Sequence, residues 1–253
     1  MIRGHVVEIL TSDRGVHTAA PLREDGVYRL LRRSPDYTRR IPAALQFFVS
    51  RRVDEAARFS ALQSNAVQGM GQVPWSYVPT ATLDADLQVA WRPAFNLGYL
   101  GVNRAHPPLD DPQVQQAIAH ALNKQAIVDA FYQAGDGVGQ VASQLLPPVL
   151  WGYDADLEDY GYDPALARSL LDQAGYADGF TTTLWVLPVQ RLYFPQAAEI
   201  AAAMQADLLA VGITATLVTH DWPIYLQKVW SGEADLFMLG WTGDYGHPDN
   251  FFY

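Results

Sequence analysis

Apolar residues in the C-terminal part of the chain recur with two spacings that alternate along the sequence. Compact apolar runs predict strands, and apolar positions three and four residues apart predict amphipathic helices. From residue 163 onward the order is helix then strand, repeated, which implies a largely parallel sheet with helices on its faces. The predicted helices cover 163–176, 197–212 and 224–233, and the predicted strands cover 181–187, 213–220 and 235–241.

The longest predicted helix covers residues 110–135. Asp111 is a favoured capping residue, Pro112 fits the first helical position, and Gly135 can end a helix. Apolar residues recur between them at the spacing that is typical of an amphipathic helix. Around this helix we predict strands at 87–91 and 96–103 and a loop at 141–162.

Shorter elements are predicted nearer the N-terminus. Apolar runs bounded by turn residues indicate strands, and one apolar stripe indicates a helix. Glycines and prolines at 69–79 are expected to interrupt regular structure. The predicted strands cover 5–10, 27–31 and 44–50, and the predicted helix covers 53–64.

Composition excludes several classes of protein. The chain of 253 residues has a formal net charge of −10, which argues against nucleic acid as a partner. It has no cysteine, and therefore no disulfide, thiol nucleophile or cysteine-based zinc site. No apolar stretch reaches the length of a membrane-spanning helix. The first residues, MIRGHVVEILTSDRG, lack a long apolar region followed by a small-residue cleavage site, so we expect no signal peptide in this chain.

Two loops at strand ends carry opposite charges. PVQRLYFP follows the core of the strand at 181–187, and GWTGDYGHPDN closes the strand at 235–241 and continues beyond it. In sheets of this kind ligands bind beyond the carboxyl ends of the strands, and parallel strands place those ends on one edge. That edge would offer a cation, Arg191, and an anion, Asp244.

Metal binding and catalysis have weaker support at the same loop. His247 together with Asp244 and Asp249 could bind a transition metal, and His247 could act as a base. One histidine among acids is a signal of low specificity, and the chain has no G-x-S-x-G nucleophile motif. We therefore expect a binding protein and not an enzyme, with no metal and no cofactor.

Several segments occur together in an order that one known family shows. They are NLGYLGVN, PPLDDPQVQQAIAHALNKQAIVDAFY, LLPPVLWGYDADLEDYGYDPALARSLLDQAGY, LPVQRLYFP and GWTGDYGHPDNFF. On these segments the chain resembles family 5 of the extracytoplasmic solute-binding proteins of ABC importers, the group that binds peptides and nickel. The segments LPVQR-x-Y and GWTGD-x-G-x-PDNFF are most similar to the dipeptide-binding subgroup.

The resemblance implies an α/β fold of type II lobes like those of periplasmic binding proteins, with a mixed sheet and helices on both faces. Family members are much longer, so we expect the lobes to be incomplete, and the chain resembles an internal piece. Residues 1–95 would be a remnant of the first lobe and the approach to the hinge, and residues 96–253 most of the second lobe. The implied partners are a short peptide ligand and the membrane permease of an ABC importer. The protein would be monomeric and periplasmic.

The resemblance also assigns roles at the two loops. Arg191 would bind the carboxylate of a dipeptide through two parallel hydrogen bonds, and Asp244 would bind its ammonium group. Tyr193 would add a hydroxyl or a ring face, Trp241 would wall the pocket, and Gly243 would let the backbone approach the ligand. Ordinary packing is the alternative for Tyr193 and Trp241, and a simple turn is the alternative for Gly243.

Three other functions stay open from the sequence. The same scaffold could carry a different cargo, such as a nickel chelate, haem or a sugar. The chain could be an enzyme with His247 as its base. It could also be a truncated fragment without function.

Overall fold

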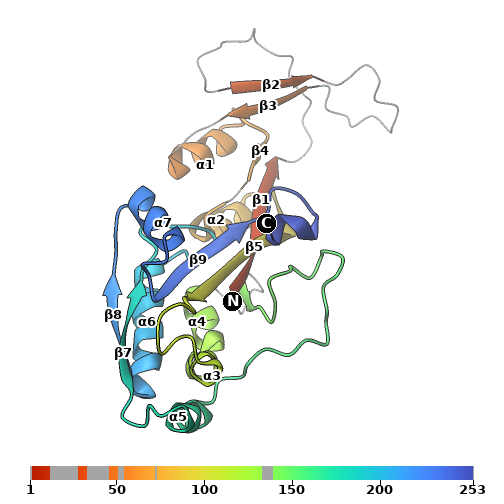
Figure 1. The fold of residues 1–253 in the computed structure, drawn as a ribbon. Helices are drawn as coiled ribbons and strands as arrows, with labels where there is room; N and C mark the ends of the chain where they lie inside the picture. The colour runs from red at the N-terminus through yellow and green to blue at the C-terminus, as the bar shows by residue number, and fades with distance from the viewer. Residues whose placement is uncertain are drawn as a thin grey trace. The chain divides into compact units, whose positions relative to one another are not determined.

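The computed structural model describes residues 2–11, 28–32, 46–50, 54–71, 73–132 and 139–252. The chain divides into two compact units, shown in Figure 1. The larger unit holds residues 1–5 and 93–253, and the smaller unit holds residues 6–92. The assignment of 1–95 and 96–253 to two lobes stays a prediction. None of the described helices is both long enough and apolar enough to cross a membrane.

The elements follow in an order close to the predicted one. The strands are β1 (Ile2–Thr11), β2 (Tyr28–Arg32), β3 (Gln46–Ser50), β4 (Gly69–Met70), β5 (Leu87–Val102), β6 (Gly139–Val141), β7 (Phe180–Trp185), β8 (Ile213–Val218) and β9 (Leu236–Thr242). The helices are α1 (Glu55–Gln63), α2 (Val78–Leu83), α3 (Pro112–Ala121), α4 (Lys124–Phe131), α5 (Pro164–Gln173), α6 (Ala197–Ala210) and α7 (Trp222–Trp230), with short 3-10 helices η1 (Trp75–Tyr77) and η3 (Pro248–Phe251).

The smaller unit has an apolar cluster of its own. Strands β2 and β3 pair antiparallel, and the second half of β1 pairs antiparallel with β4. The rings of Phe59 and Tyr77 stack with their centroids 4.6 Å apart. Over the described residues, the predicted strands at 5–10, 27–31 and 44–50 and the predicted helix at 53–64 are confirmed, and residues 27, 44, 45 and 53 lie outside them. The buried members of the cluster are Phe59, Leu62, Met70, Val73, Val78 and Ala81.

The larger unit is built on a mixed sheet in which the order of neighbouring strands is β5-β9-β7-β8. Strand β7 is parallel to both β8 and β9, so the parallel arrangement predicted for the C-terminal strands is confirmed. Strand β9 is antiparallel to β5 on its other side. Strand β6 pairs antiparallel with the first residues of β1.

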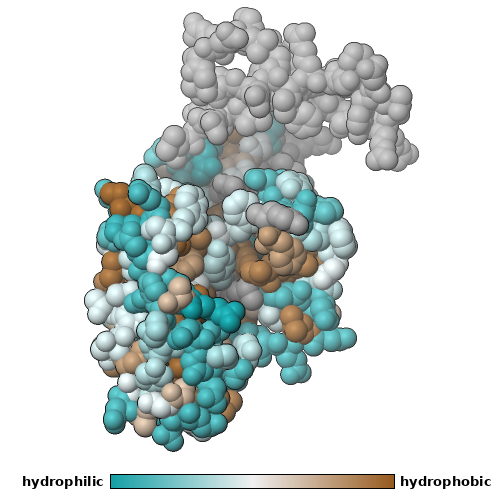
Figure 2. All heavy atoms as spheres, in the orientation of Figure 1, coloured by the Kyte–Doolittle hydropathy of each residue, from teal (hydrophilic) through white to brown (hydrophobic). Residues whose placement is uncertain are grey.

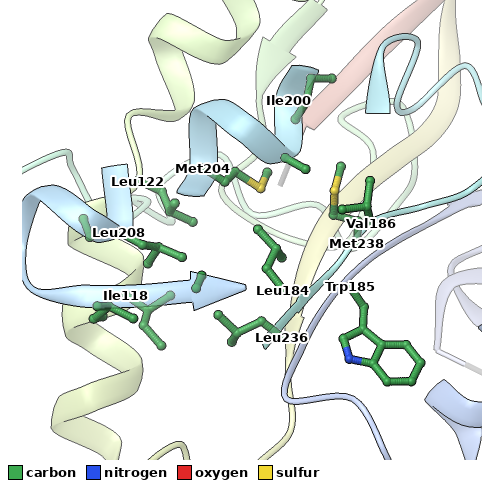
Figure 3. Close-up of a cluster of buried hydrophobic side chains, with 14 of the residues drawn as sticks. Ile118, Leu122, Leu184, Trp185, Val186, Ile200, Met204, Leu208, Leu236 and Met238 are labelled. Carbon is green, nitrogen blue, oxygen red and sulfur yellow. The ribbon is translucent and has the colours of Figure 1, made fainter. Parts of the chain in front are cut away.

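Helices cover both faces of this sheet, as predicted. Neighbouring residues of a strand point to opposite faces. Leu184 of β7 lies opposite Leu236 of β9, and their side chains pack in the same apolar cluster as Met204 of α6 (Figure 3). On the other face, the ring of Trp185 lies 6.1 Å from the ring of Tyr225 in α7. The two faces therefore have separate helical layers.

The surface of the larger unit is mostly hydrophilic on the face that Figure 2 presents. Apolar patches lie over α7 and near the C-terminal end of the chain. Exposed apolar residues of these two segments are Ile224, Trp230, Trp241, Tyr245 and Phe252.

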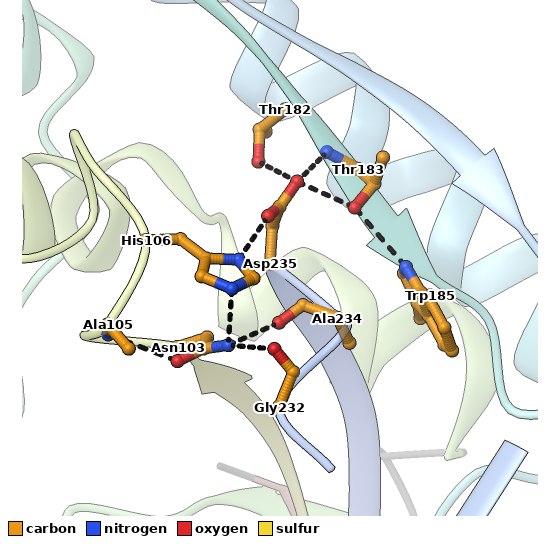
Figure 4. A network of polar contacts seen from close by, with 9 residues as sticks. All are labelled: Asn103, Ala105, His106, Thr182, Thr183, Trp185, Gly232, Ala234 and Asp235. Atoms are coloured by element: carbon orange, nitrogen blue, oxygen red, sulfur yellow. Dashed lines mark hydrogen bonds and ion pairs between the residues drawn. The ribbon is translucent and has the colours of Figure 1, made fainter. Parts of the chain in front are cut away.

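A polar network joins the end of β5 and strand β7 to the start of β9 (Figure 4). Asp235 Oδ2 accepts hydrogen bonds from the Thr183 backbone N–H at 2.9 Å and from the Thr183 hydroxyl at 2.7 Å. Asp235 Oδ1 lies 2.8 Å from His106 Nδ1. The Asn103 amide donates to the carbonyl oxygens of Gly232 and Ala234, each at 2.9 Å. Three strands are therefore tied together by charged and amide hydrogen bonds.

The predicted helix at 110–135 is wrong as a single helix. Asp111 does cap α3, since its carboxylate accepts from the Gln113 N–H at 2.7 Å. The helix ends before Asn123, whose side chain accepts from the Ala126 N–H and starts α4. The Asn123 N–H donates to Asp207 Oδ2 at 2.9 Å, so it is not available to continue α3. Helix α4 ends at Phe131, and the proposed stop at Gly135 lies outside the described residues.

The two strands predicted at 87–91 and 96–103 form one continuous strand, β5. Pro93 lies within β5, although proline cannot donate to a strand ladder. Its fixed φ is nevertheless compatible with an extended backbone, so the strand runs through it.

The interruption predicted at 69–79 is only partly right, because helix α2 begins inside it. Pro79 occupies the first turn of α2. Backbone N–H groups in that turn have no partner within the helix, so proline costs no hydrogen bond there.

The Asp235 network predicts an acid-sensitive contribution to stability. Burial would raise the pKa of the Asp235 carboxyl, but hydrogen bonds from Thr183, His106 and Thr182 outweigh it and hold the pKa below its usual value. Asp235→Asn should lower the free energy of unfolding by about 1.5–3 kcal/mol at pH 7, because hydrogen bonds to a charged acceptor are lost. The contribution is present above the unfolded pKa of about 3.9 and is lost as the pH falls through the lower folded pKa.

Urea unfolding of the wild type and Asp235→Asn between pH 7 and pH 2 measures this difference. The gap between the two proteins should narrow below about pH 4. Asp172→Asn, a change at an exposed carboxylate of α5, is the control and should alter stability by less than about 0.5 kcal/mol. A gap that stays constant down to pH 2 would contradict the role given to the Asp235 carboxylate.

Candidate functional site

Three segments leave the sheet at the same edge. Because β7, β8 and β9 are parallel, their carboxyl ends lie side by side. The segment after β7 carries Arg191 and Tyr193, the segment after β8 leads into α7 at Trp222, and the loop after β9 carries Gly243 and Asp244. The parallel arrangement predicted for these strands therefore brings both candidate loops to one edge, together with the start of α7.

Tyr193 packs in a notch between β5 and β9. Gly98 of β5 lies directly opposite Gly240 of β9. A Cβ on Gly240 would lie 2.4 Å from Cδ2 of the Tyr193 ring, and a Cβ on Gly98 would lie 2.6 Å from the Tyr193 carbonyl oxygen. The Tyr132 hydroxyl donates to that same carbonyl oxygen at 2.6 Å. The absence of two side chains thus makes the space that holds this segment against the sheet.

The Tyr193 side chain takes the packing role, and its role in ligand binding stays a prediction. It is only 7% exposed, so it packs as a core residue. Burial raises the pKa of its phenol, and the Arg191 guanidinium opposes that rise through its charge and a side-chain hydrogen bond. The phenol is therefore neutral at pH 7 and lies against Arg191.

Arg191 is an exposed cation held by aromatic groups. Its Cζ lies 5.1 Å from the centroid of the Trp222 ring. Its backbone exchanges hydrogen bonds with Phe194, which closes a tight turn. Among the described residues, no carboxylate forms an ion pair with its guanidinium. Within the part of the chain that the structure describes, the positive charge is thus positioned by aromatic groups and not by an anion.

Asn250 fixes the loop after β9. Its Oδ1 accepts hydrogen bonds from Trp241 Nε1 at 3.2 Å and from the Asp244 backbone N–H at 2.8 Å. The Gly243 N–H donates to the Phe95 carbonyl oxygen at 2.7 Å, and a Cβ on Gly243 would lie 2.9 Å from Phe95 Cβ. Close packing on Phe95 therefore explains glycine at this position.

Trp241 and Asp244 both reach solvent from this loop. The Trp241 ring is 42% exposed, so it is not a core tryptophan. Asp244 is exposed, and its carboxylate forms no ion pair with any residue of the described ranges. That the side chains of Asp244 and Arg191 lie close enough to bind the two ends of one dipeptide stays a prediction.

His247 is engaged in local contacts. Its Nδ1 lies 2.6 Å from Asp249 Oδ1, and its ring meets the Trp151 ring edge-on at 5.3 Å. Across the described residues, no group of three or more histidine, cysteine or acidic side chains could hold a metal ion. The histidine is best explained as the cap of η3.

Sequence reasoning missed Trp222 and Asn250. Trp222 follows β8, so the rule that ligands bind beyond strand ends could have placed it beside the other two loops. Asn250 had no comparable signal, because an acceptor for two groups of its own loop is visible only in three dimensions.

The comparisons with known proteins agree with this architecture. The sequence profile of the bacterial extracellular solute-binding proteins, family 5, middle region, matches residues 23–253. The chain belongs to this family. The solute-binding family 5 fold accounts for the mixed sheet with helices on both faces, and its lobes are of the type II periplasmic-binding-protein kind.

Several curated relatives are named as dipeptide-binding or di/tripeptide-binding proteins. The dipeptide-binding protein of Escherichia coli K12 is 43% identical over 199 residues, which cover 79% of this chain and 37% of the relative. Heme-binding protein A of Haemophilus influenzae is 38% identical over 168 residues, covering 66% of this chain and 30% of the relative. The chain thus spans well under half the length of the curated relatives it matches.

Two solved structures also resemble most of this chain, and the chain covers less than half of each of them. HbpA2 from Haemophilus parasuis has a TM-score of 0.77 at 32% identity, covering 91% of this chain and 45% of that protein. The dipeptide-binding protein from Pseudoalteromonas sp. SM9913 in complex with Met-Leu has a TM-score of 0.65 at 29% identity, covering 88% of this chain and 43% of that protein.

The notch predicts that Gly240→Ala is destabilising. The new Cβ would overlap the Tyr193 ring and the Leu97 carbonyl oxygen, each 2.4 Å away, so the free energy of unfolding should fall by about 1–3 kcal/mol. Gly161→Ala is the matched control, because a Cβ there meets nothing within 4 Å. Denaturant unfolding measures both. Equal stability of the two variants would show that the notch does not hold the Tyr193 segment.

Proposed function

We propose that this chain is the ligand-binding part of the solute-binding component of an ABC importer. It binds dipeptides or other short peptides by their charged termini, and the protein to which it belongs delivers them to a membrane permease. The observation that carries this proposal is Arg191, an exposed cation that lies against aromatic groups and forms no ion pair with any carboxylate of the described residues. The family and the name of the Escherichia coli relative support the peptide as cargo.

A dipeptide zwitterion needs a fixed cation and a fixed anion. The Arg191 guanidinium matches a carboxylate through two parallel hydrogen bonds. An internal ion pair would compete with the ligand for this cation, whereas the ring of Trp222 leaves its hydrogen-bond donors free. Asp244, at the same sheet edge, would bind the ammonium group, and Trp241 would cover the ligand with its exposed ring.

Recognition of this kind depends on groups that every peptide shares. Gly243, whose missing side chain also leaves room for Phe95, would let backbone groups of the loop pair with the ligand backbone. Pairing of this kind is indifferent to the peptide side chains. In this proposal residues 1–95 belong to the first lobe and the hinge approach, and residues 96–253 to the second lobe. The protein would act as a periplasmic monomer that binds its ligand without changing it chemically.

Arg191→Ala should remove most of the affinity for Met-Leu. The loss should be about 2–5 kcal/mol, because the peptide carboxylate is left without its partner. Isothermal calorimetry measures it. Arg104→Ala is the control: Arg104 is exposed and follows β5, which is antiparallel to β9, so it lies at the opposite sheet edge. Unchanged affinity in Arg191→Ala would rule out the assigned role.

Asp244→Asn should weaken the binding of Met-Leu and leave the binding of N-acetyl-Met-Leu unchanged. The acetylated peptide has no ammonium group, so it gains nothing from the carboxylate at position 244. Calorimetry of both proteins with both peptides forms a double-mutant cycle, which isolates the contact between the two charges. Equal weakening for both peptides would place the ammonium group elsewhere.

Other cargo would give different signals. Haem, which the name of the Haemophilus influenzae relative suggests, would produce a Soret absorbance band on titration. A nickel chelate would appear in metal analysis, and a sugar would bind calorimetrically when neither peptide does. If no ligand of any of these classes binds, the chain is not a binding unit by itself.

A further inference from the structure

The ring of Trp222 lies against the guanidinium of Arg191. Trp222 is the first residue of α7, whereas Arg191 is in the segment after β7 (Figure 1). The 5.1 Å from Arg191 Cζ to the ring centroid is within the range of a cation–π contact. An arginine can stack its planar guanidinium on such a ring while keeping its N–H groups free.

The Trp222 ring also packs on a second aromatic ring of α7. It stacks on the Tyr225 ring with centroids 5.9 Å apart and 17° between the planes. Tyr225 is fully buried, and its hydroxyl lies 2.6 Å from the Met238 carbonyl oxygen and 3.2 Å from that of Trp185. These two acceptors belong to β9 and β7, so the stack rests on both strands.

Trp185, which accepts from the Tyr225 hydroxyl, also belongs to the polar network of Figure 4. Trp185 Nε1 donates to the Thr183 hydroxyl at 3.2 Å, and Thr183 donates to Asp235. Arg191 also lies against the Tyr193 phenol, whose pKa is raised by burial. Arg191 therefore contacts both an anchored ring stack and the Tyr193 hydroxyl.

We propose that Trp222 is a positioning residue for Arg191, and that the stack of Arg191, Trp222 and Tyr225 sets the plane in which a free peptide carboxylate is bound. This inference rests on the proposed function. A free arginine side chain has many rotamers, and the ring face restricts them before the ligand arrives. A carboxylate that pairs with two N–H groups must lie in the guanidinium plane, so fixing that plane favours free acids over amides.

The test compares Met-Leu with its C-terminal amide on three variants of the whole chain. Trp222→Ala should weaken Met-Leu binding roughly threefold to thirtyfold and leave amide binding unchanged, so the preference for the free acid falls. Trp222→Phe keeps a ring face and should retain most of the preference. Trp222→Leu keeps apolar volume without a π face and should behave like Trp222→Ala.

Trp230→Ala is the matched control, because this tryptophan ends the same helix and is 75% exposed. It should alter neither titration. Equal weakening of acid and amide in Trp222→Ala and Trp222→Leu, or an unchanged preference in both, would overturn the positioning role.

Arg191→Ala separates this inference from the proposed function. If the wild type shows no preference for the free acid, or Arg191→Ala keeps that preference, the proposed function fails. If Arg191→Ala loses the preference while Trp222→Ala and Trp222→Leu keep it, the proposed function stands and only the positioning role fails.

Discussion

The parallel pairing of β7 with β9 is the constraint on which the rest of the site depends. Leu184 lies opposite Leu236 in this pairing, and Asp235 joins the strands by accepting hydrogen bonds from Thr183. Because both strands run in the same direction, the segments that follow them leave at one edge. Strand β9 continues past the end of β7 to Thr242, and this free length is where the Tyr193 segment packs.

Much of this arrangement could be predicted from the sequence. Each C-terminal element keeps one hydrophobic spacing along its length, so the order of helices and strands is visible, and that order determines a parallel sheet. Capping also follows from residue type, as Asp111 shows at the start of α3. The parallel direction of the strands alone predicts that Arg191 and Asp244 follow strands that end at one edge.

The features that the sequence did not predict, the break within residues 110–135 and the contact of Arg191 with Trp222, depend on residues that are far apart in the chain. Helix 110–135 is broken because a carboxylate from α6, Asp207, takes the N–H of Asn123. A capping residue inside an apolar helical pattern was the available warning. The contact of Arg191 with Trp222 joins the ends of two strands, and hydrophobic spacing does not encode which side chains meet there.

The facing pair Gly98 and Gly240 has a consequence for chimeric binding proteins. The ring of Tyr193 fits against Gly240, and its carbonyl oxygen fits against Gly98, because both strand positions lack a Cβ. A segment spanning 186–196 transplanted into a relative with larger residues at those two positions would be lifted off its strands, and its arginine would be displaced with it. Loop and strand positions must therefore be exchanged as one module when specificity is transferred between members of the family.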